Sequence, residues 1–176
     1  MDTKYLVALL LVAGLVGGIS NNYIGDYYSN SSEDVETVEV GNQAPDFTIT
    51  NIDGNDFNLS DFEGDKVIVL EFMNIGCGTC HDFEKNILKS YYNNTTRPSD
   101  VEIISVTQGN EDRDDVADRV QGNWIYAIGN DEMTDVFEAE RSPTIVIINK
   151  EGIVSFSKQG TLSEEDLENH VNSALA

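Results

Sequence analysis

The sequence predicts an α/β fold in which a mixed β-sheet carries helices on both of its faces. Three observations support this prediction. Short apolar segments alternate with amphipathic segments along most of the chain, the segment 66–73 is almost continuously apolar, and the chain closes with a hairpin and a helix. Strands separated by helices pair in parallel, whereas a hairpin adds an antiparallel strand, so the sheet is expected to contain both kinds of pairing.

The predicted sheet begins with a small hairpin and a central strand. Segments 47–49 and 56–59 flank an Asp-Gly dipeptide, which is typical of a tight turn between two strands. Segment 66–73 has the continuous apolar character of a strand that is buried on both faces. A glycine-containing turn with two cysteines follows, and apolar residues then recur at helical spacing over 80–92.

Two further strand–helix pairs are predicted in the middle of the chain. Segments 101–106 and 124–128 are short and rich in apolar residues, as expected of strands. Segment 111–121 is mostly polar but carries two valines four residues apart, which predicts a helix with one buried face. Segment 131–139 predicts a shorter helix.

A second hairpin and a final helix complete the predicted domain. Segments 144–148 and 153–156 flank a turn that contains glycine, so they are expected to pair as antiparallel strands. Ser163 is the predicted N-cap of a helix that extends to Leu175. Asp166 stands three residues after this serine, in the arrangement of a capping box.

The first 24 residues are predicted to be a signal peptide or a membrane anchor. Segment 5–19 carries no charge, but as a helix it would span only about 22 Å of a ~30 Å hydrocarbon core. Extension to Ile24 reaches the required length, so a cleaved signal and an uncleaved anchor both remain open. Lys4 precedes the run and no Lys or Arg follows it before Lys66. The rest of the chain is therefore expected outside the cytoplasm.

The remainder of the chain is predicted to be an acidic tether and one domain. Residues 25–40 are polar and acidic, as in a flexible linker, and residues 41–176 form the domain. The whole chain has 10 basic and 32 acidic residues, and its formal net charge is -22. Such an excess of negative charge repels phosphate backbones and argues against nucleic-acid binding. A solvated and highly soluble surface is expected instead.

The two cysteines of the chain, Cys77 and Cys80, are separated by two residues. A disulfide between them closes almost no loop and adds little stability, so the pair is expected to be kept for its reactivity. At a helix N-terminus, Cys77 is exposed to the positive end of the helix dipole, which favours its thiolate. Cys80 lies one turn further along and is predicted to be the more buried, resolving thiol. Protonated His81 would favour the thiolate, whereas Asp82 and Glu84 oppose it.

Three motifs resemble those of the thioredoxin-like superfamily. A buried strand followed by a turn and the sequence Cys-Gly-Thr-Cys at the start of a helix resembles the thioredoxin active site. Ser-Pro-Thr at 142–144, before an apolar hairpin, resembles the cis-proline loop. Residues 41–47 and the hairpin after them are similar to the N-terminal extension of membrane-anchored, TlpA/ResA-type oxidoreductases. The resemblance covers about residues 41–174 and implies a thioredoxin fold with an N-terminal β-hairpin extension.

The resemblance also implies roles for individual residues. Cys77 would be the nucleophile and Cys80 the resolving cysteine. Pro143 would be a cis proline packed against the disulfide, and Glu71 would be a buried acid that accepts the proton of Cys80 through water. The residues expected to contact a substrate are Gly76, Gly78, Thr79, Ser142 and Thr144. Gly76 stands where the family usually has tryptophan, which widens access to the first cysteine.

By this resemblance the chain is expected to be an extracytoplasmic thiol–disulfide oxidoreductase, acting on proteins more as a reductant than as an oxidant. The dithiol would itself be the redox centre, so no separate cofactor and no metal are expected. The expected partners are disulfide-bearing or dithiol proteins, a membrane protein that donates or accepts electrons, and the membrane through the N-terminal helix.

Three other functions remain open from the sequence. The cysteine motif followed by His81 matches C-x-x-C-H, the attachment motif of c-type haem, with His81 as axial ligand. Against this, the motif follows a buried strand, whereas small c-type cytochromes are helical. A metal site would need the distant His170, and that spacing does not suit a closed tetrahedral shell. The chain could also be a redox-inactive binding module that retains the fold and a static disulfide.

Overall fold

The computed structural model describes residues 37–176. The predicted signal peptide or membrane anchor, and most of the predicted tether, lie outside these residues. Within 37–176, none of the helices has both the length and the apolar character needed to cross a membrane.

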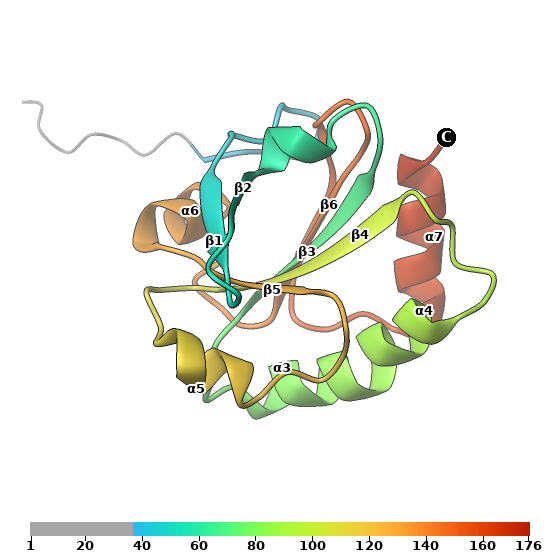
Figure 1. Cartoon of the computed structure of the whole chain (residues 1–176). Helices are drawn as coiled ribbons and strands as arrows, with labels where there is room; N and C mark the ends of the chain where they lie inside the picture. The colour runs from blue at the N-terminus through green and yellow to red at the C-terminus, as the bar shows by residue number, and fades with distance from the viewer. Residues whose placement is uncertain (1–36) are drawn as a thin grey trace, which may run out of the picture. The chain divides into compact units, whose positions relative to one another are not determined.

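A seven-stranded sheet forms the centre of this domain, in the order β2-β1-β5-β4-β3-β6-β7 (Figure 1). Its strands are β1 (Thr48–Asn51), β2 (Asp56–Asn58), β3 (Val67–Met73), β4 (Val101–Thr107), β5 (Ile125–Ile128), β6 (Thr144–Ile148) and β7 (Val154–Gln159). Strand β3 pairs in parallel with β4 and antiparallel with β6, and β4 pairs in parallel with β5. The sheet is therefore mixed, as predicted.

Antiparallel pairs lie at both edges of the sheet. β1 pairs with β2, with Ile49 opposite Phe57, and β1 also connects this pair to β5. β6 pairs with β7, with Val146 opposite Ser157. The side chain of Asn149 closes the second hairpin, because its oxygen accepts a hydrogen bond from the Ile153 N–H at 2.8 Å.

The helices lie on the two faces of this sheet. They are η1 (Leu59–Phe62), α3 (Gly78–Phe83), η2 (Glu84–Leu88), α4 (Lys89–Asn93), α5 (Arg113–Ala117), α6 (Asp131–Val136) and α7 (Glu164–Ala174). α3, η2 and α4 run on without a break, and η2 is a single wider turn of π-helix between them. Ser163 caps α7 by accepting a hydrogen bond from the Asp166 N–H, which confirms the predicted N-cap.

Strand β3 separates two hydrophobic cores. Val67 and Val69 belong to the core beneath α3, α4 and α7, whereas Ile68 and Leu70 belong to the core that includes α6 and η1. Figure 1 shows α6 away from the continuous helix of α3 and α4. All seven residues of β3 are buried. Because successive strand residues face opposite sides of a sheet, this burial confirms the prediction of a strand covered on both faces.

The helix predicted over 111–121 is wrong in its extent, since α5 covers only Arg113–Ala117. Val116 is fully buried, but Val120 is 39% exposed and does not continue the predicted apolar face. Beyond α5 the chain makes tertiary hydrogen bonds that a continuing helix could not form. The Arg119 guanidinium donates to the carbonyl of Asn74 at 2.5 Å, and the Gln121 N–H donates to the hydroxyl of Tyr126 at 3.0 Å.

Gly129 lies where two backbone segments approach closely at the end of β5. A Cβ atom on this residue would stand 2.1 Å from the carbonyl oxygen of Thr107, and backbone atoms cannot move aside as a flexible side chain can. We expect Gly129→Ala to lower the free energy of unfolding of the oxidised full chain by about 1–3 kcal/mol, measured by urea denaturation.

Gly109→Ala is the matched control for this substitution. A Cβ on Gly109 would meet only Asp131 Oδ1, at an ordinary contact distance of 3.7 Å. Its effect should stay within about 0.5 kcal/mol. Equal losses in the two variants would mean that the close approach at Gly129 does not limit stability.

Candidate active site

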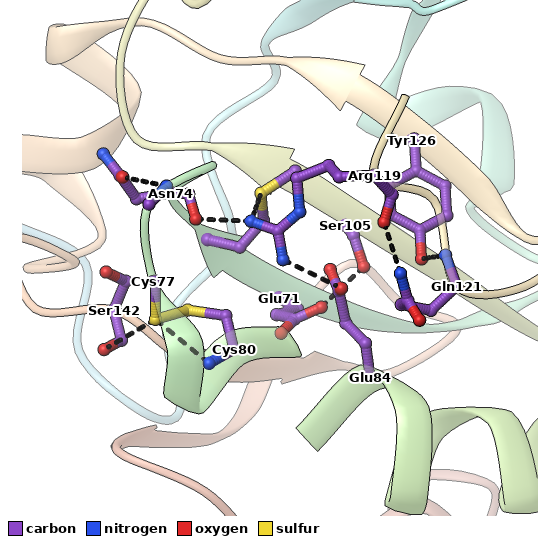
Figure 2. A network of polar contacts seen from close by, with 12 residues as sticks. Glu71, Asn74, Cys77, Cys80, Glu84, Ser105, Arg119, Gln121, Tyr126 and Ser142 are labelled. Carbon is purple, nitrogen blue, oxygen red and sulfur yellow. Dashed lines mark hydrogen bonds and ion pairs between the residues drawn. A yellow bond between two sulfur atoms is a disulfide. The ribbon is translucent and has the colours of Figure 1, made fainter. Parts of the chain in front are cut away.

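The turn after β3 places Cys77 at the start of a helix. The side-chain oxygen of Asn74 accepts a hydrogen bond from the Gly76 N–H at 2.9 Å, and the Asn74 carbonyl accepts one from the Cys77 N–H at 3.0 Å. Cys77 is the N-cap of α3, and its sulfur accepts a hydrogen bond from the Cys80 N–H at 3.0 Å. The strand–turn–helix arrangement predicted for the cysteine pair is therefore present (Figure 2).

The two cysteines form a disulfide and differ in exposure. Cys80 is fully buried, whereas Cys77 is only partly buried. A partner molecule can therefore reach the sulfur of Cys77 more easily than that of Cys80. This difference fits an attacking role for the first cysteine and a resolving role for the second.

The loop before β6 approaches the disulfide from a distant part of the chain. The Cys77 sulfur lies 3.6 Å from the carbonyl oxygen of Ser142, and the Ser142–Pro143 peptide bond is cis. Pro143 is buried and Ser142 is half-buried. The structure thus brings together the cysteine pair and the proline loop, which are 65 residues apart in the sequence.

The residues predicted to contact a substrate fall into two groups. Gly76, Gly78 and Thr79 are exposed around the disulfide. Thr144, in contrast, is fully buried, and its hydroxyl donates a hydrogen bond to the Arg141 carbonyl at 2.6 Å. Thr144 therefore holds the proline loop from inside and does not present its side chain to the surface.

Glu71 is a fully buried carboxyl group on β3. It alternates along the strand with Val69 and Met73, which belong to the same core as Cys80, so Glu71 points toward the face covered by α3. Burial raises the pKa of Glu71 well above its usual value, and the nearby charge of Glu84 raises it further. Both effects favour the protonated form of this carboxyl group in the oxidised protein.

A chain of hydrogen bonds orients Glu71. The Ser105 hydroxyl donates to Glu71 Oε2 at 2.6 Å, and the Trp124 indole N–H donates to that hydroxyl at 2.9 Å. Indole is a donor only, so the single hydroxyl proton of Ser105 is free for Glu71. Among the described residues Glu71 Oε1 has no hydrogen-bond partner, which leaves this oxygen to carry the dissociable proton.

Glu84 is a second buried carboxyl group, and its burial was not predicted from the sequence. It is fully buried, one helical turn after Cys80, and its N–H donates to the Cys80 carbonyl. Its Oε2 lies 3.1 Å from the Arg119 guanidinium. Burial raises the pKa of Glu84 to about 7, against the opposing effect of the Arg119 charge.

The sequence holds a signal for Glu84 but only a weak one for Arg119. Cys80 and Glu84 are four residues apart, a spacing that puts both on one face of a helix. Arg119 is the only Lys or Arg between Arg113 and Arg141. Its partner lies 35 residues away, so no local pattern could have identified the pair.

Three further polar residues singled out from the sequence are His81, Asp82 and His170. His81 is half-buried, Asp82 is exposed, and His170 stacks on the Phe156 ring with a centroid distance of 3.7 Å. In the part of the chain that the structure describes, no three His, Cys, Asp or Glu side chains are grouped so that they could hold a metal ion.

Comparison with a family model and with known proteins identifies relatives of this chain. A family model described as Redoxin matches residues 39–175. The thiol-disulfide oxidoreductase ResA of Geobacillus kaustophilus is 30% identical over 98% of this chain and 94% of its own length. The thioredoxin-like protein YneN of Bacillus subtilis is 25% identical over 96% of each chain.

Two solved structures show the same fold. The thioredoxin domain of a thiol-disulfide oxidoreductase from Bacteroides vulgatus is similar with a TM-score of 0.61 and 22% identity, over 77% of this chain and 100% of that domain. A thiol:disulfide interchange protein of the thioredoxin family from Chlorobium tepidum is similar with a TM-score of 0.62 and 21% identity, over 78% of this chain and 99% of the other.

Proposed function

This chain belongs to the redoxin family, as a thiol-disulfide oxidoreductase of the TlpA/ResA type, and from that premise we propose that it reduces disulfides in exported proteins. The observation that carries the proposal is the asymmetry of the cysteine pair. Cys77 is accessible at a helix N-terminus beside the proline loop, and Cys80 is fully buried one turn behind it.

The proposed cycle is an exchange of disulfides without another cofactor. The Cys77 thiolate attacks a substrate disulfide, forms a mixed disulfide and releases one substrate thiolate. The Cys80 thiolate then attacks the Cys77 sulfur and releases the second substrate thiolate, so two electrons pass to the substrate. The Cys77–Cys80 disulfide remains. Glu71, which is ionised when Cys80 attacks, accepts the proton that leaves Cys80, through water, and is therefore protonated in the oxidised protein.

An extended protein segment is the proposed substrate form. The exposed backbone at Gly76, Gly78 and Thr79 and the half-buried Ser142 surround the Cys77 sulfur. Ile75, which is 37% exposed, adds an apolar contact at the same edge. The Ser142 carbonyl, next to Pro143, lies 3.6 Å from the sulfur and forms part of this surface.

The negative charge near the dithiol supports the reducing direction. A thiolate at Cys77 is destabilised by nearby carboxylates, and here Asp82 is exposed two residues after Cys80 within a chain of net charge -22. An oxidant needs a reduced form that is stabilised. An acidic environment acts in the opposite sense, and so favours transfer of electrons from the dithiol to the substrate.

The location and the electron source are also part of the proposal. The uncharged segment 5–19, with a lysine before it, supports export of the domain and its attachment to the membrane by the N-terminal helix. A membrane protein that passes electrons to the Cys77–Cys80 disulfide would then regenerate the dithiol.

The equilibrium reduction potential of the full chain in detergent, measured against glutathione, tests the function. Free thiols are trapped at each ratio of reduced to oxidised glutathione and counted by mass. A reversible change of two thiols with a potential near -270 mV, as in thioredoxin, is the expected result. A potential near -120 mV would reverse the proposed direction. Cysteines that never change state would indicate a binding module with a static disulfide.

A further inference from the structure

We propose that Arg119 is a positioning residue of the dithiol chemistry, which keeps the buried proton of the site on Glu71 by pairing with Glu84. The inference rests on the proposed function and adds to it a residue that does not touch the sulfur atoms.

The guanidinium of Arg119 is held between two parts of the site (Figure 2). Its side chain is 11% exposed, and one terminal nitrogen lies 3.1 Å from Glu84 Oε2. The other donates to the Asn74 carbonyl at 2.5 Å and lies 3.8 Å from the Met73 sulfur. Arg119 therefore joins the helix behind Cys80 to the end of the central strand.

The charges of the buried groups balance only if one carboxyl group carries a proton. Glu71 and Glu84 are both fully buried, and within residues 37–176 Arg119 is the single cation paired with them. Arginine does not lose its proton in proteins, so it matches one carboxylate and not two. The guanidinium contacts Glu84 and not Glu71. Glu71 instead accepts a hydrogen bond from the hydroxyl of Ser105. The second carboxyl group, Glu71, is the one that remains neutral.

Arg119 also touches the turn that carries the nucleophile. The Asn74 carbonyl accepts hydrogen bonds from both Arg119 and the Cys77 N–H. The position of the guanidinium is therefore linked to the backbone of Cys77 through one shared acceptor. Loss of Arg119 would change the charge behind Cys80 and loosen the turn before Cys77 together.

Few other titratable groups face this cluster. Tyr126 on β5 is buried, and burial raises the pKa of its hydroxyl, so it stays neutral. Glu111 reaches the site only through the side-chain amide of Asn74, at 3.3 Å. α3 carries Cys80, and Cys77 is its N-cap. The other titratable residues of α3 are the half-buried His81 and the exposed Asp82. The proton balance of the site is thus set mainly by Glu71, Glu84 and Arg119.

Infrared spectroscopy of the oxidised full chain at pH 8 tests the assignment without requiring turnover. The wild type should show one protonated buried carboxyl band, and Glu71→Gln should remove it. Arg119→Gln should show a second band, because Glu84 takes up a proton when its cation is lost, and Glu84→Gln should remove that second band. A single unchanged band in Arg119→Gln would overturn the proposal.

The pH dependence of the reduction potential provides the functional readout. The slope of the reduction potential against pH gives the number of protons taken up per reduced disulfide. In Arg119→Gln, the pH at which this number changes should rise by at least about one unit, because Glu84 loses the cation that favours its ionised form. The shift should vanish when Glu84→Gln is also present, and Arg119→Lys should restore part of the wild-type profile because it returns the charge without the second contact. Arg113→Gln, an exposed site on α5 with the same loss of charge, should leave the profile unchanged.

The outcomes separate this inference from the proposed function. The role of Arg119 alone is overturned if the wild type cycles but the pH profile of Arg119→Gln is not shifted. It is also overturned if that shift persists when Glu84→Gln is present. A wild type whose cysteines never cycle overturns the proposed function, and the infrared bands then still decide where the buried proton lies.

Discussion

Replacing Cys80 with serine is expected to trap the full chain on its substrate as a mixed disulfide. The reduced variant is mixed with a peptide that carries one internal disulfide, and the products are analysed by non-reducing mass spectrometry. Cys77 can still attack, but no buried thiol is left to release the adduct. The adduct should become the major species, and multiple turnover should fall by at least about a thousandfold.

Cys77→Ser is the matched control, because it leaves the other cysteine in place. Cys80 is 0% exposed, so a substrate disulfide cannot reach its sulfur while the domain is folded. This variant should lose turnover to the same extent and form no adduct. Adducts of equal yield in the two variants would show that the buried sulfur is reached as easily as the exposed one, and the order of attack would have to be abandoned.

The parts of the fold that the sequence predicted well are those with a local cause. Strand β3 was predicted because a strand covered on both faces needs apolar residues at every position, and only Glu71 interrupts that run from Val67 to Met73. The reactive pair was predicted for the same reason, since both sulfur atoms and the helix N-terminus that activates them lie within four residues.

The parts that the sequence did not predict depend on contacts between distant segments. Arg119 was placed in a polar helix because nothing near it in the chain indicates a buried carboxylate 35 residues away. Glu84 was treated as a charge near Cys77, although its spacing from Cys80 puts it on the buried face of the helix. Thr144 was expected to contact a substrate, but its side chain is fully buried at the start of β6 and its hydroxyl donates to the Arg141 carbonyl.

Glu71 could be predicted only in part from the sequence. Its position six residues before Cys77 was enough to suggest a buried acid, by resemblance to thioredoxin. The hydrogen bonds that orient it come from β4 and from the residue before β5, through Ser105 and Trp124. The sequence could thus indicate the acid but not the arrangement that decides which of its oxygens holds the proton.

The stability of the oxidised full chain is expected to fall as the pH rises from 5 to 8. Glu84 has a pKa of about 7 in the folded state, against 4.5 as the ordinary value, so the folded protein binds the proton more tightly than the unfolded chain. The stabilisation is complete below pH 4.5 and is lost as the pH rises toward and past 7. For Glu84 alone the loss is on the order of 3 kcal/mol. The pKa of Glu71 is also raised by burial, so Glu71 acts in the same direction.

Urea denaturation across this range, in 1 M salt, separates the buried carboxyl groups from the acidic surface. Repulsion among the surface carboxylates also weakens the fold as they ionise, but at 1 M ionic strength it is screened over about 3 Å, whereas the buried pair is screened much less. Glu84→Gln cannot titrate at this position, so its stability should change less between pH 5 and 7 than that of the wild type. The two proteins are compared by the change of their free energy of unfolding with pH. Their absolute stabilities also differ because the glutamine leaves Arg119 without its counter-charge. An identical slope in the two proteins would mean that Glu84 is not the group whose burial links proton binding to folding.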